Sequence, residues 1–208
     1  MVKVGLTGAR YSGKDAAAKA FAQIGVPVFD ADTLLKYILN FDIEVNKKIM
    51  DGYGRYIFTG AGATIDPREI RSKSDFERLI EFAEPSLIKA YDRFREKNRE
   101  SIYTIFHSSI LFERGWNEAM DYSISVFSPD AERISRAMLA EKLTRPKIES
   151  LISSEMDPLQ KSKLSDFVVH NYESAASVFG DSIMQVCKID QQIVDKFLDK
   201  KQWLDVVY

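Results

Sequence analysis

Short apolar runs alternate along this chain with longer stretches in which apolar residues recur every three or four positions. The short runs predict buried strands at residues 2–7, 26–29, 101–107, 122–127 and 166–171. One longer stretch, residues 74–100, is an amphipathic helix whose apolar face we expect to form a core: Phe76, Leu79, Ile80, Ala83, Leu87, Ile88, Tyr91 and Phe94. Pro85 within it predicts a kink or break.

Other helical stretches separate these strands. Residues 15–24 follow the first strand, residues 33–39 and 42–50 form two short helices, and residues 52–62 are a glycine-rich loop. The end of the chain, residues 177–200, is mainly helical with a last strand candidate at residues 185–189. The chain has no internal repeat or dividing linker, so we expect a single domain over residues 1–208.

The first candidate functional residues directly follow the first predicted strand. Glycines there allow the backbone to turn with its N–H groups inward, where they and the positive end of the following helix hold phosphate oxygens. A lysine directly after the second glycine reaches the β- and γ-phosphates. We therefore predict a nucleotide-binding loop, with a mere strand-to-helix turn as the alternative, from the residues Gly8, Ala9, Arg10, Tyr11, Ser12, Gly13, Lys14, Asp15 and Ala16.

Asp15 departs from the motif G-x-x-x-x-G-K-[ST], in which a hydroxyl group at this position meets Mg²⁺. A carboxylate is also a hard oxygen ligand, so Asp15 is a candidate metal ligand, either directly or through water. Its negative charge lies close to the expected phosphates. We therefore expect nucleotide binding to depend strongly on the metal.

Two carboxylates follow the second predicted strand. Asp30 and Asp32 lie on one side of the chain because side chains alternate along a strand, and strand ends near a phosphate loop face the phosphates. One of them could be the general base for an acceptor hydroxyl, while the other supports a metal-bound water. The alternative for Asp32 is that it caps the helix that begins at Thr33.

Composition narrows the class of protein. The 208 residues suffice for one substantial core, and a net charge of −2 does not indicate binding to nucleic acid or a membrane surface. The sequence shows no membrane-spanning run and no signal-peptide pattern, and its single cysteine, Cys187, excludes an intrachain disulfide. We expect Cys187 to be buried and the protein to be cytoplasmic; the sequence leaves its oligomeric state open.

Two further features have alternative interpretations. The polar helical stretch at residues 129–161, punctuated by Pro146 and Pro158, is basic and suits a lid that closes over phosphates, or else a solvated helix pair. His107 ends the third strand and could contact phosphate or transfer a proton. A structural histidine is the favoured interpretation, because the sequence shows no partner for it.

Taken together, these segments resemble the dephospho-coenzyme A kinase family. The resemblance is carried by Gly5-Leu6-Thr7-Gly8, Ser12-Gly13-Lys14 and Asp30-Ala31-Asp32, and continues through Leu111-Phe112-Glu113 to Asp166 and Asn171. It implies a three-layer α/β P-loop kinase fold with a parallel sheet of about five strands. It also implies a helical acceptor-binding region at residues 33–100 and a lid at residues 129–161.

The resemblance further implies transfer of the γ-phosphoryl group of ATP to the ribose 3′-hydroxyl of dephospho-CoA, with Mg²⁺ as the metal. Asp32 would be the catalytic base, Lys14 would hold the transferring phosphate and Arg136 would face it from the lid. Asp30, Asp32 and Arg71 are the expected acceptor-binding residues. Ala140 stands where a second lid arginine is expected.

Two other functions stay open. A Gly-Lys-Asp loop also resembles some viral nucleotide kinases, so the acceptor could be a deoxynucleoside monophosphate whose phosphate is bound by Arg68, Arg71 and Arg93. Loss of the lid charge and of both hydroxyls after Lys14 would instead favour a nucleotide-binding protein without kinase activity. In every case the expected partners are small molecules, with neither nucleic acid nor membrane involved.

Overall fold

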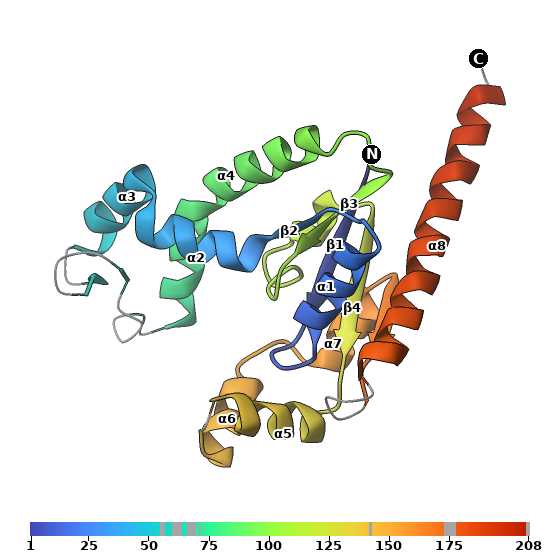
Figure 1. The fold of residues 1–208 in the computed structure, drawn as a ribbon. Helices are drawn as coiled ribbons and strands as arrows, with labels where there is room; N and C mark the ends of the chain where they lie inside the picture. Colours follow the sequence, from blue (N-terminus) through green and yellow to red (C-terminus); the bar gives the residue numbers. More distant parts are fainter. Residues whose placement is uncertain are drawn as a thin grey trace. The chain divides into compact units, whose positions relative to one another are not determined.

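A five-stranded sheet lies at the centre of the computed structural model, which describes residues 1–54, 57–59, 64–65, 70, 72–141, 143–172 and 178–206. The pairs β3–β1, β1–β4 and β4–β5 are parallel, so the strand ends that precede the helices share one edge. The strands run in the order β2-β3-β1-β4-β5 (Figure 1), with the bounds β1 Val2–Gly8, β2 Val28–Asp30, β3 Tyr103–His107, β4 Tyr122–Phe127 and β5 Phe167–His170.

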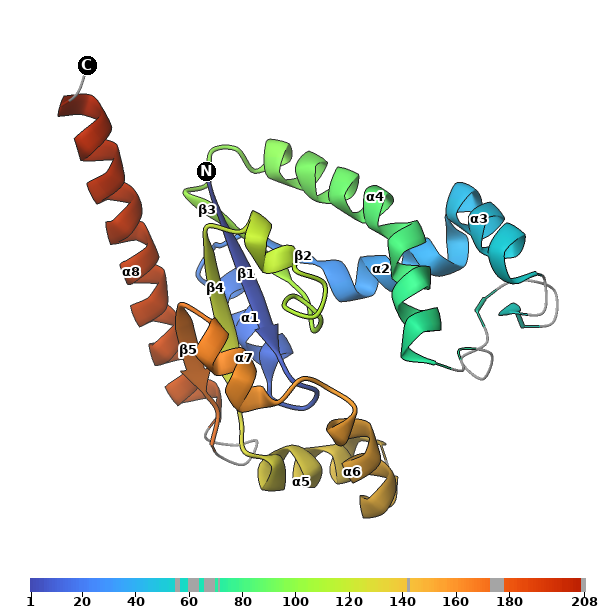
Figure 2. The ribbon, with the colours of Figure 1, turned by 180° about the vertical axis from the view of Figure 1, so that it is seen from behind.

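Helices cover both faces of this sheet, which gives the three layers that the family resemblance implies. α1 (Lys14–Gln23) and α8 (Val178–Val206) pack against each other on one face (Figure 1). α7 (Pro158–Leu164) packs against β1 and β4 on the opposite face, seen from behind in Figure 2.

The prediction of a strand at residues 185–189 is wrong, because α8 includes these residues without interruption. Val186, Ile189 and Ile193 are buried at helical spacing, and that period outweighs the short apolar run that suggested a strand. Cys187 lies on the other side of the same helix and is exposed, so its predicted burial is also wrong.

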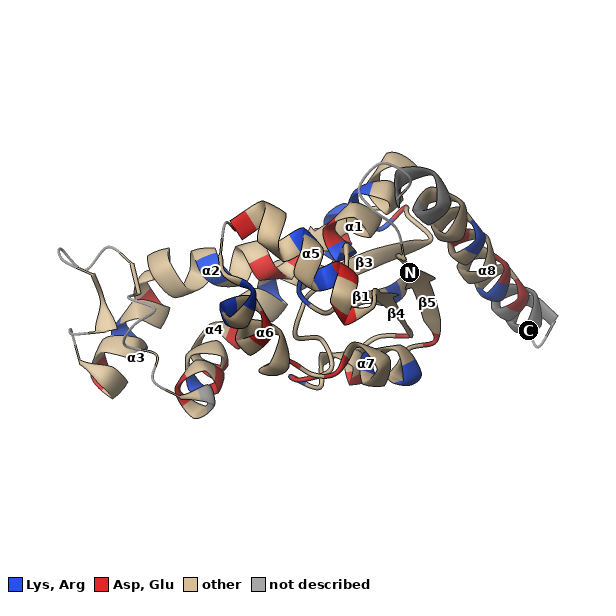
Figure 3. Cartoon of the chain, turned by 90° about the horizontal axis from the view of Figure 1, so that it is seen from below, with Lys and Arg blue, Asp and Glu red and all other residues tan. Residues whose placement is uncertain are grey.

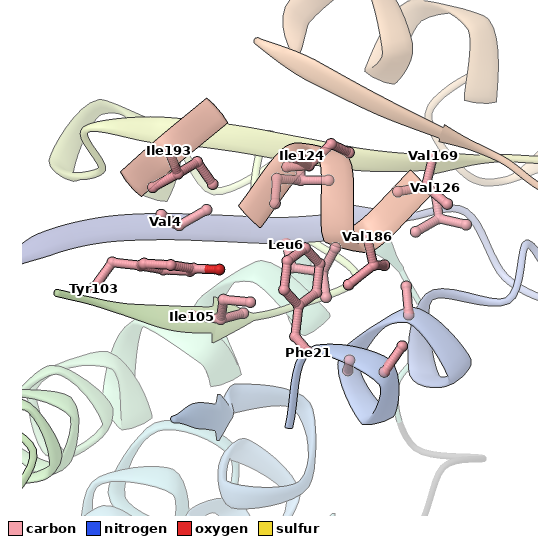
Figure 4. Packing of buried hydrophobic residues seen from close by; sticks show 14 residues of the cluster. Val4, Leu6, Phe21, Tyr103, Ile105, Ile124, Val126, Val169, Val186 and Ile193 are labelled. Carbon is pink, nitrogen blue, oxygen red and sulfur yellow. The ribbon is translucent and has the colours of Figure 1, made fainter. Parts of the chain in front are cut away.

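The main core fills the space between the sheet and the pair α1 and α8. Val4 and Leu6 of β1 point into it and are fully buried, together with Phe21 of α1 and Val186 of α8 (Figure 4). Burial of each such side chain contributes roughly 1.5–3 kcal/mol. The two elements that flank the predicted nucleotide-binding loop are therefore held by the best-packed part of the molecule.

The segment after β3 covers the other face of the sheet. Gly5 of β1 faces Leu111, and a Cβ at Gly5 would lie 2.6 Å from the Leu111 side chain. Trp116, in the 3-10 helix η3 (Trp116–Ala119), forms a T-shaped contact with Phe106 at a centroid distance of 5.5 Å. Glycine in β1 thus allows this segment to approach the sheet closely.

The chain forms two compact units, Met1–Phe29 with Asn98–Tyr208, and Asp30–Lys97. The second unit contains α2 (Ala31–Phe41), α3 (Ile43–Tyr53) and α4 (Lys73–Lys97). Asp42 joins its helices, because its carboxylate accepts hydrogen bonds from the N–H groups that begin α3 and from the hydroxyl of Ser86 on α4. Gly52, expected in a loop, belongs to the last turn of α3.

The helix predicted at residues 74–100 is confirmed as α4, but it continues through Pro85 without a break. Five of the predicted core residues are buried: Leu79, Ile80, Ala83, Leu87 and Tyr91. Phe76 and Ile88 are 40% and 49% exposed, so their assignment to the core is wrong. The buried stripe is narrower than the apolar pattern, and its packing outweighs the roughly 3 kcal/mol that an interior proline costs.

In the first unit, α5 (Asp130–Glu141) and α6 (Arg145–Ser153) follow β4. A small core of Ala137, Ile148 and Ile152 lies between them, and Tyr11 of the loop after β1 packs against it. Pro146 and Pro158 lie in the first turns of α6 and α7, where a proline interrupts no hydrogen bond. Within the described chain, no helix is both long and apolar enough to cross a membrane.

Candidate functional site

The loop between β1 and α1 has the geometry of an anion site. Gly13 is the N-cap of α1, with φ at 96°, and no side chain caps the helix. The N–H groups of the first turn therefore point out of the positive end of α1, where an anion is favoured. A Cβ at Gly13 would strain the backbone and would clash with Nδ2 of Asn171, so two independent reasons require glycine.

The hydroxyl of Ser12 is a second feature that points to an anion. Ser12 is fully buried, and among the described residues its Oγ has no hydrogen-bond partner. Gly8 makes room for it, since a Cβ at Gly8 would lie 2.5 Å from Ser12 Oγ. Burial of an unpaired hydroxyl costs about 1–3 kcal/mol, and an oxyanion inside the loop would accept its hydrogen bond.

Arg133 of α5 holds the outer side of this loop. It is fully buried, donates from Nε to the carbonyl oxygen of Arg10 at 2.8 Å, and forms an ion pair with Glu155 at 3.1 Å. Glu155 in turn accepts hydrogen bonds from the backbone N–H of Arg10 at 2.9 Å and from its Nε at 2.8 Å. The N–H of Arg10, within the predicted nucleotide-binding segment, is thus directed to a carboxylate of the protein.

Arg136 lies one turn further along α5 and contacts the same loop. Its guanidinium donates to the carbonyl oxygens of Tyr11 and Asn171, both at 3.2 Å, and to the hydroxyl of Ser128 at 3.0 Å. It also forms an ion pair with Glu132 at 3.2 Å. Burial lowers the pKa of Arg136 and Glu132 opposes that change, so the guanidinium remains charged. Figure 3 shows the acidic and basic residues that α5 carries.

Lys14, Asp15 and His107 meet where β3 ends. Lys14 Nζ lies 2.8 Å from Asp15 Oδ1 and 3.3 Å from His107 Nε2, and His107 Nε2 lies 3.2 Å from the same carboxylate oxygen. The Asp15 side chain is 76% exposed, whereas those of Lys14 and His107 are 13% and 5% exposed. The hydrogen bond from His107, assisted by Lys14 and opposed by burial, holds the pKa of Asp15 well below its usual range.

Asp30 and Asp32 begin the second unit and differ in what they contact. Asp30 is the N-cap of α2: its carboxylate accepts hydrogen bonds from the backbone N–H of Thr33 at 2.9 Å and from the Thr33 hydroxyl at 2.7 Å. The alternative in which Asp32 caps this helix is therefore wrong, since Asp32 lies within its first turn. Arg71, the third expected acceptor-binding residue, lies outside the described residues.

The segment Leu111-Phe112-Glu113 is tied to α7 by a buried lysine. Lys161 is 2% exposed, donates to the carbonyl oxygen of Ser109 and forms an ion pair with Glu113 at 2.8 Å. Because Ser109 follows His107 by two residues, this pair also fixes the chain just after β3.

The side chains at the loop can ligate Mg²⁺ only if a bound nucleotide supplies further oxygen ligands. In the part of the chain that the structure describes, no group of three or more His, Cys, Asp or Glu side chains could hold a metal ion. Asp15 offers one exposed carboxylate beside Lys14. Mg²⁺ is commonly bound by one or two carboxylates together with substrate phosphates and water, and a single aspartate suits that arrangement.

Comparison with known proteins decides the family. The model of the dephospho-CoA kinase family matches residues 2–177. The chain belongs to the dephospho-CoA kinase family. The dephospho-CoA kinase of Fusobacterium nucleatum is 28% identical over 181 residues, covering 85% of this chain and 92% of that protein. That of Listeria monocytogenes is 27% identical over 179 residues, covering 82% and 88%.

Solved structures agree with the fold of a dephospho-CoA kinase. TT1252 from Thermus thermophilus has a TM-score of 0.75 at 22% identity and covers 92% of this chain and 96% of its own. The dephospho-CoA kinase of Campylobacter jejuni has a TM-score of 0.53 at 18% identity with the same coverage. Shikimate kinase from Bacteroides thetaiotaomicron, at 13% identity, has a TM-score of 0.51 and covers 91% and 98%. The predicted α/β P-loop kinase fold is thereby confirmed.

Sequence reasoning alone misses Arg133 and Glu155, and it favours a structural role for His107. Lys14 and His107 are 93 positions apart, and Arg133 and Glu155 are 22 apart, so no local pattern connects them. Two signals did exist. An aspartate replaces the usual hydroxyl residue of the dephospho-CoA kinase loop, and a histidine ends a predicted strand.

Proposed function

We propose that this chain is an ATP-dependent phosphotransferase that transfers the γ-phosphoryl group of ATP to the ribose 3′-hydroxyl of dephospho-CoA. The observation that carries the proposal is the loop with Lys14 at the uncapped N-terminus of α1, in a chain whose residues 2–177 match the dephospho-CoA kinase family. Family membership supplies the acceptor, and the loop supplies the phosphate site.

The proposed roles at the loop follow from the chemistry of phosphoryl transfer, which depends mainly on positioning and charge. Lys14 and the first N–H groups of α1 bind the β- and γ-phosphates, and the Ser12 hydroxyl donates a further hydrogen bond. Mg²⁺, when bound, neutralises charge that develops on the phosphates. Asp15 is the protein ligand that would hold it.

The second unit is the proposed acceptor-binding region, within the expected residues 33–100. Asp32 is the proposed base that takes the proton of the acceptor hydroxyl. Asp30 supports it indirectly, since its capping bonds to Thr33 fix the turn that carries Asp32. Arg71 is a proposed contact for the acceptor.

A second candidate is nucleotide binding without transfer, and the position of Arg136 favours it. The guanidinium of Arg136 donates to the carbonyl oxygens of Tyr11 and Asn171. In this position it stabilises the loop and does not place its positive charge against a phosphate. Ala140 adds no charge one turn later on α5. Loss of a transition-state arginine commonly reduces turnover by on the order of a thousandfold.

The experiment that separates these functions offers the purified protein ATP and Mg²⁺ with dephospho-CoA, and then with a panel of nucleoside monophosphates, while ADP formation is followed. We expect turnover with dephospho-CoA. Turnover only with a nucleotide would refute the proposed acceptor, and ATP binding without any turnover would establish the second candidate. Repeating the assay with Asp15→Ser over a range of Mg²⁺ tests the metal role, which an unchanged Mg²⁺ requirement would exclude.

A further inference from the structure

Asp15 creates an electrostatic problem for the proposed nucleotide site. Its carboxylate lies 2.8 Å from the Lys14 ammonium, the group expected to bind phosphate. A triphosphate that approaches Lys14 would therefore meet a negative charge beside it, and like charges at close range repel. Nucleotide binding therefore requires that Asp15 does not compete with the phosphates for the Lys14 ammonium.

His107 is placed to solve this problem. Its Nε2 lies within 3.3 Å of both Lys14 Nζ and Asp15 Oδ1, and its side chain is 5% exposed at the end of a core strand. His107 Nε2 can form only one of these two hydrogen bonds at a time. Without a proton it accepts from Lys14 Nζ, and with a proton it donates to Asp15 Oδ1. Lys14 and Asp15, in contrast, belong to the loop and the first turn of α1.

We propose that His107 is a positioning residue that retains the Asp15 carboxylate when Lys14 turns to the nucleotide phosphate. In that state Nε2–H donates to Asp15 Oδ1, which offsets the charge of Asp15 and keeps it directed to β3. Lys14 then directs its donors to phosphate. This proposal rests on the proposed nucleotide binding and adds to it a residue outside the loop.

The burial of the two partners supports this assignment. Asp15 is mostly exposed and can turn, whereas His107 is enclosed and offers Asp15 a fixed donor. The segment that follows His107 is held by the buried Lys161, which further limits its movement.

A double-mutant cycle on ATP binding tests the proposal, measured by direct titration with and without Mg²⁺. Without the metal, we expect His107→Ala to weaken binding about tenfold, the size of one lost hydrogen bond to a charged group. We expect Asp15→Ser to bind ATP about tenfold more tightly than the wild type, because a neighbouring negative charge is removed. The double variant should bind as tightly as Asp15→Ser alone, because His107 acts only through Asp15.

Three control variants test whether the change in ATP affinity is specific to His107 and Asp15. Asp199→Ser removes the same charge from an exposed position of α8 and should leave ATP binding unchanged. His107→Gln keeps a donor and should restore most of the affinity. His107→Phe keeps the ring volume without a donor and should behave as His107→Ala does, so the cycle remains available if the alanine variant does not fold.

Two outcomes would overturn the proposal. If His107→Ala weakens binding equally in the Asp15→Ser background, His107 acts on the phosphate or on the loop itself. If it has no effect in the wild type, the pair has no role in binding. A wild-type protein that binds no ATP would refute the proposed function together with this inference, whereas ATP binding without coupling between the two positions would refute this inference alone.

Discussion

Asp32 is the residue to which the proposed function assigns the transfer step, as distinct from nucleotide binding. We expect Asp32→Asn to lower kcat by about 10²–10⁴, the usual contribution of a positioned general base, and to change ATP affinity less than twofold. Asparagine keeps the size of the side chain in the first turn of α2. Steady-state ADP formation at saturating dephospho-CoA gives kcat, and direct titration gives the affinity for ATP.

Asp51→Asn is the matched control for this variant, since Asp51 is an exposed aspartate of α3 in the same unit. It should keep the wild-type kcat. An Asp32→Asn protein with wild-type turnover would remove Asp32 from the mechanism and would leave proton transfer to another group or to water.

Among the elements, α5 has a role that its amphipathic sequence does not reveal: it braces the phosphate loop. Arg133→Met would leave the Arg10 carbonyl without its guanidinium donor and would leave Glu155, a largely buried carboxylate, with Arg10 as its remaining ionic partner. Removal of one member of a buried ion pair costs about 3–5 kcal/mol when the other charge is left unpaired; because Arg10 still pairs with Glu155, we expect a loss of unfolding free energy of about 3 kcal/mol, at the low end of that range. Urea denaturation followed by circular dichroism measures it.

Arg145→Met is the corresponding change at an exposed ion pair. Arg145 lies in α6, pairs with Glu149 one turn away and is 64% exposed, so its loss should cost less than about 0.5 kcal/mol. Equal destabilisation by the two variants would mean that the contacts of Arg133 with the loop contribute nothing beyond those of a surface pair.

The elements also show which parts of the structure follow from sequence. Residues 122–127 form β4 with the predicted bounds because β-branched and aromatic residues alternate there with serine, and a period of two indicates a strand. The apolar run at residues 185–189 predicts a strand although it is helical, because five residues cannot distinguish a strand from one turn of a buried helix. Gly13 and Lys14 are predictable because the phosphate loop is local in sequence. The pairing of His107 with Asp15 is not, since packing of β1 beside β3 creates it.

At the scale of the whole molecule, nucleotide binding can be measured without phosphoryl transfer, through the thermal stability of the unit that contains the phosphate loop. Trp116 is buried in the unit that contains the phosphate loop. Its fluorescence therefore follows unfolding of that unit. A ligand that binds only the folded state at about one hundred times its Kd adds about 2.7 kcal/mol of stability. For a chain of this size, that corresponds to a rise in Tm of roughly 5 to 10 °C.

We expect ADP with Mg²⁺ to produce this rise in the wild type and almost none in Lys14→Met, because the proposed phosphate contact is lost. Lys19→Met removes the same charge from an exposed position in the same helix and should keep the full rise. Thermal unfolding followed by tryptophan fluorescence measures all three proteins. An equal rise in Lys14→Met and Lys19→Met would mean that the nucleotide binds away from the loop, and the proposed phosphate site would then be wrong even if the enzyme proved active.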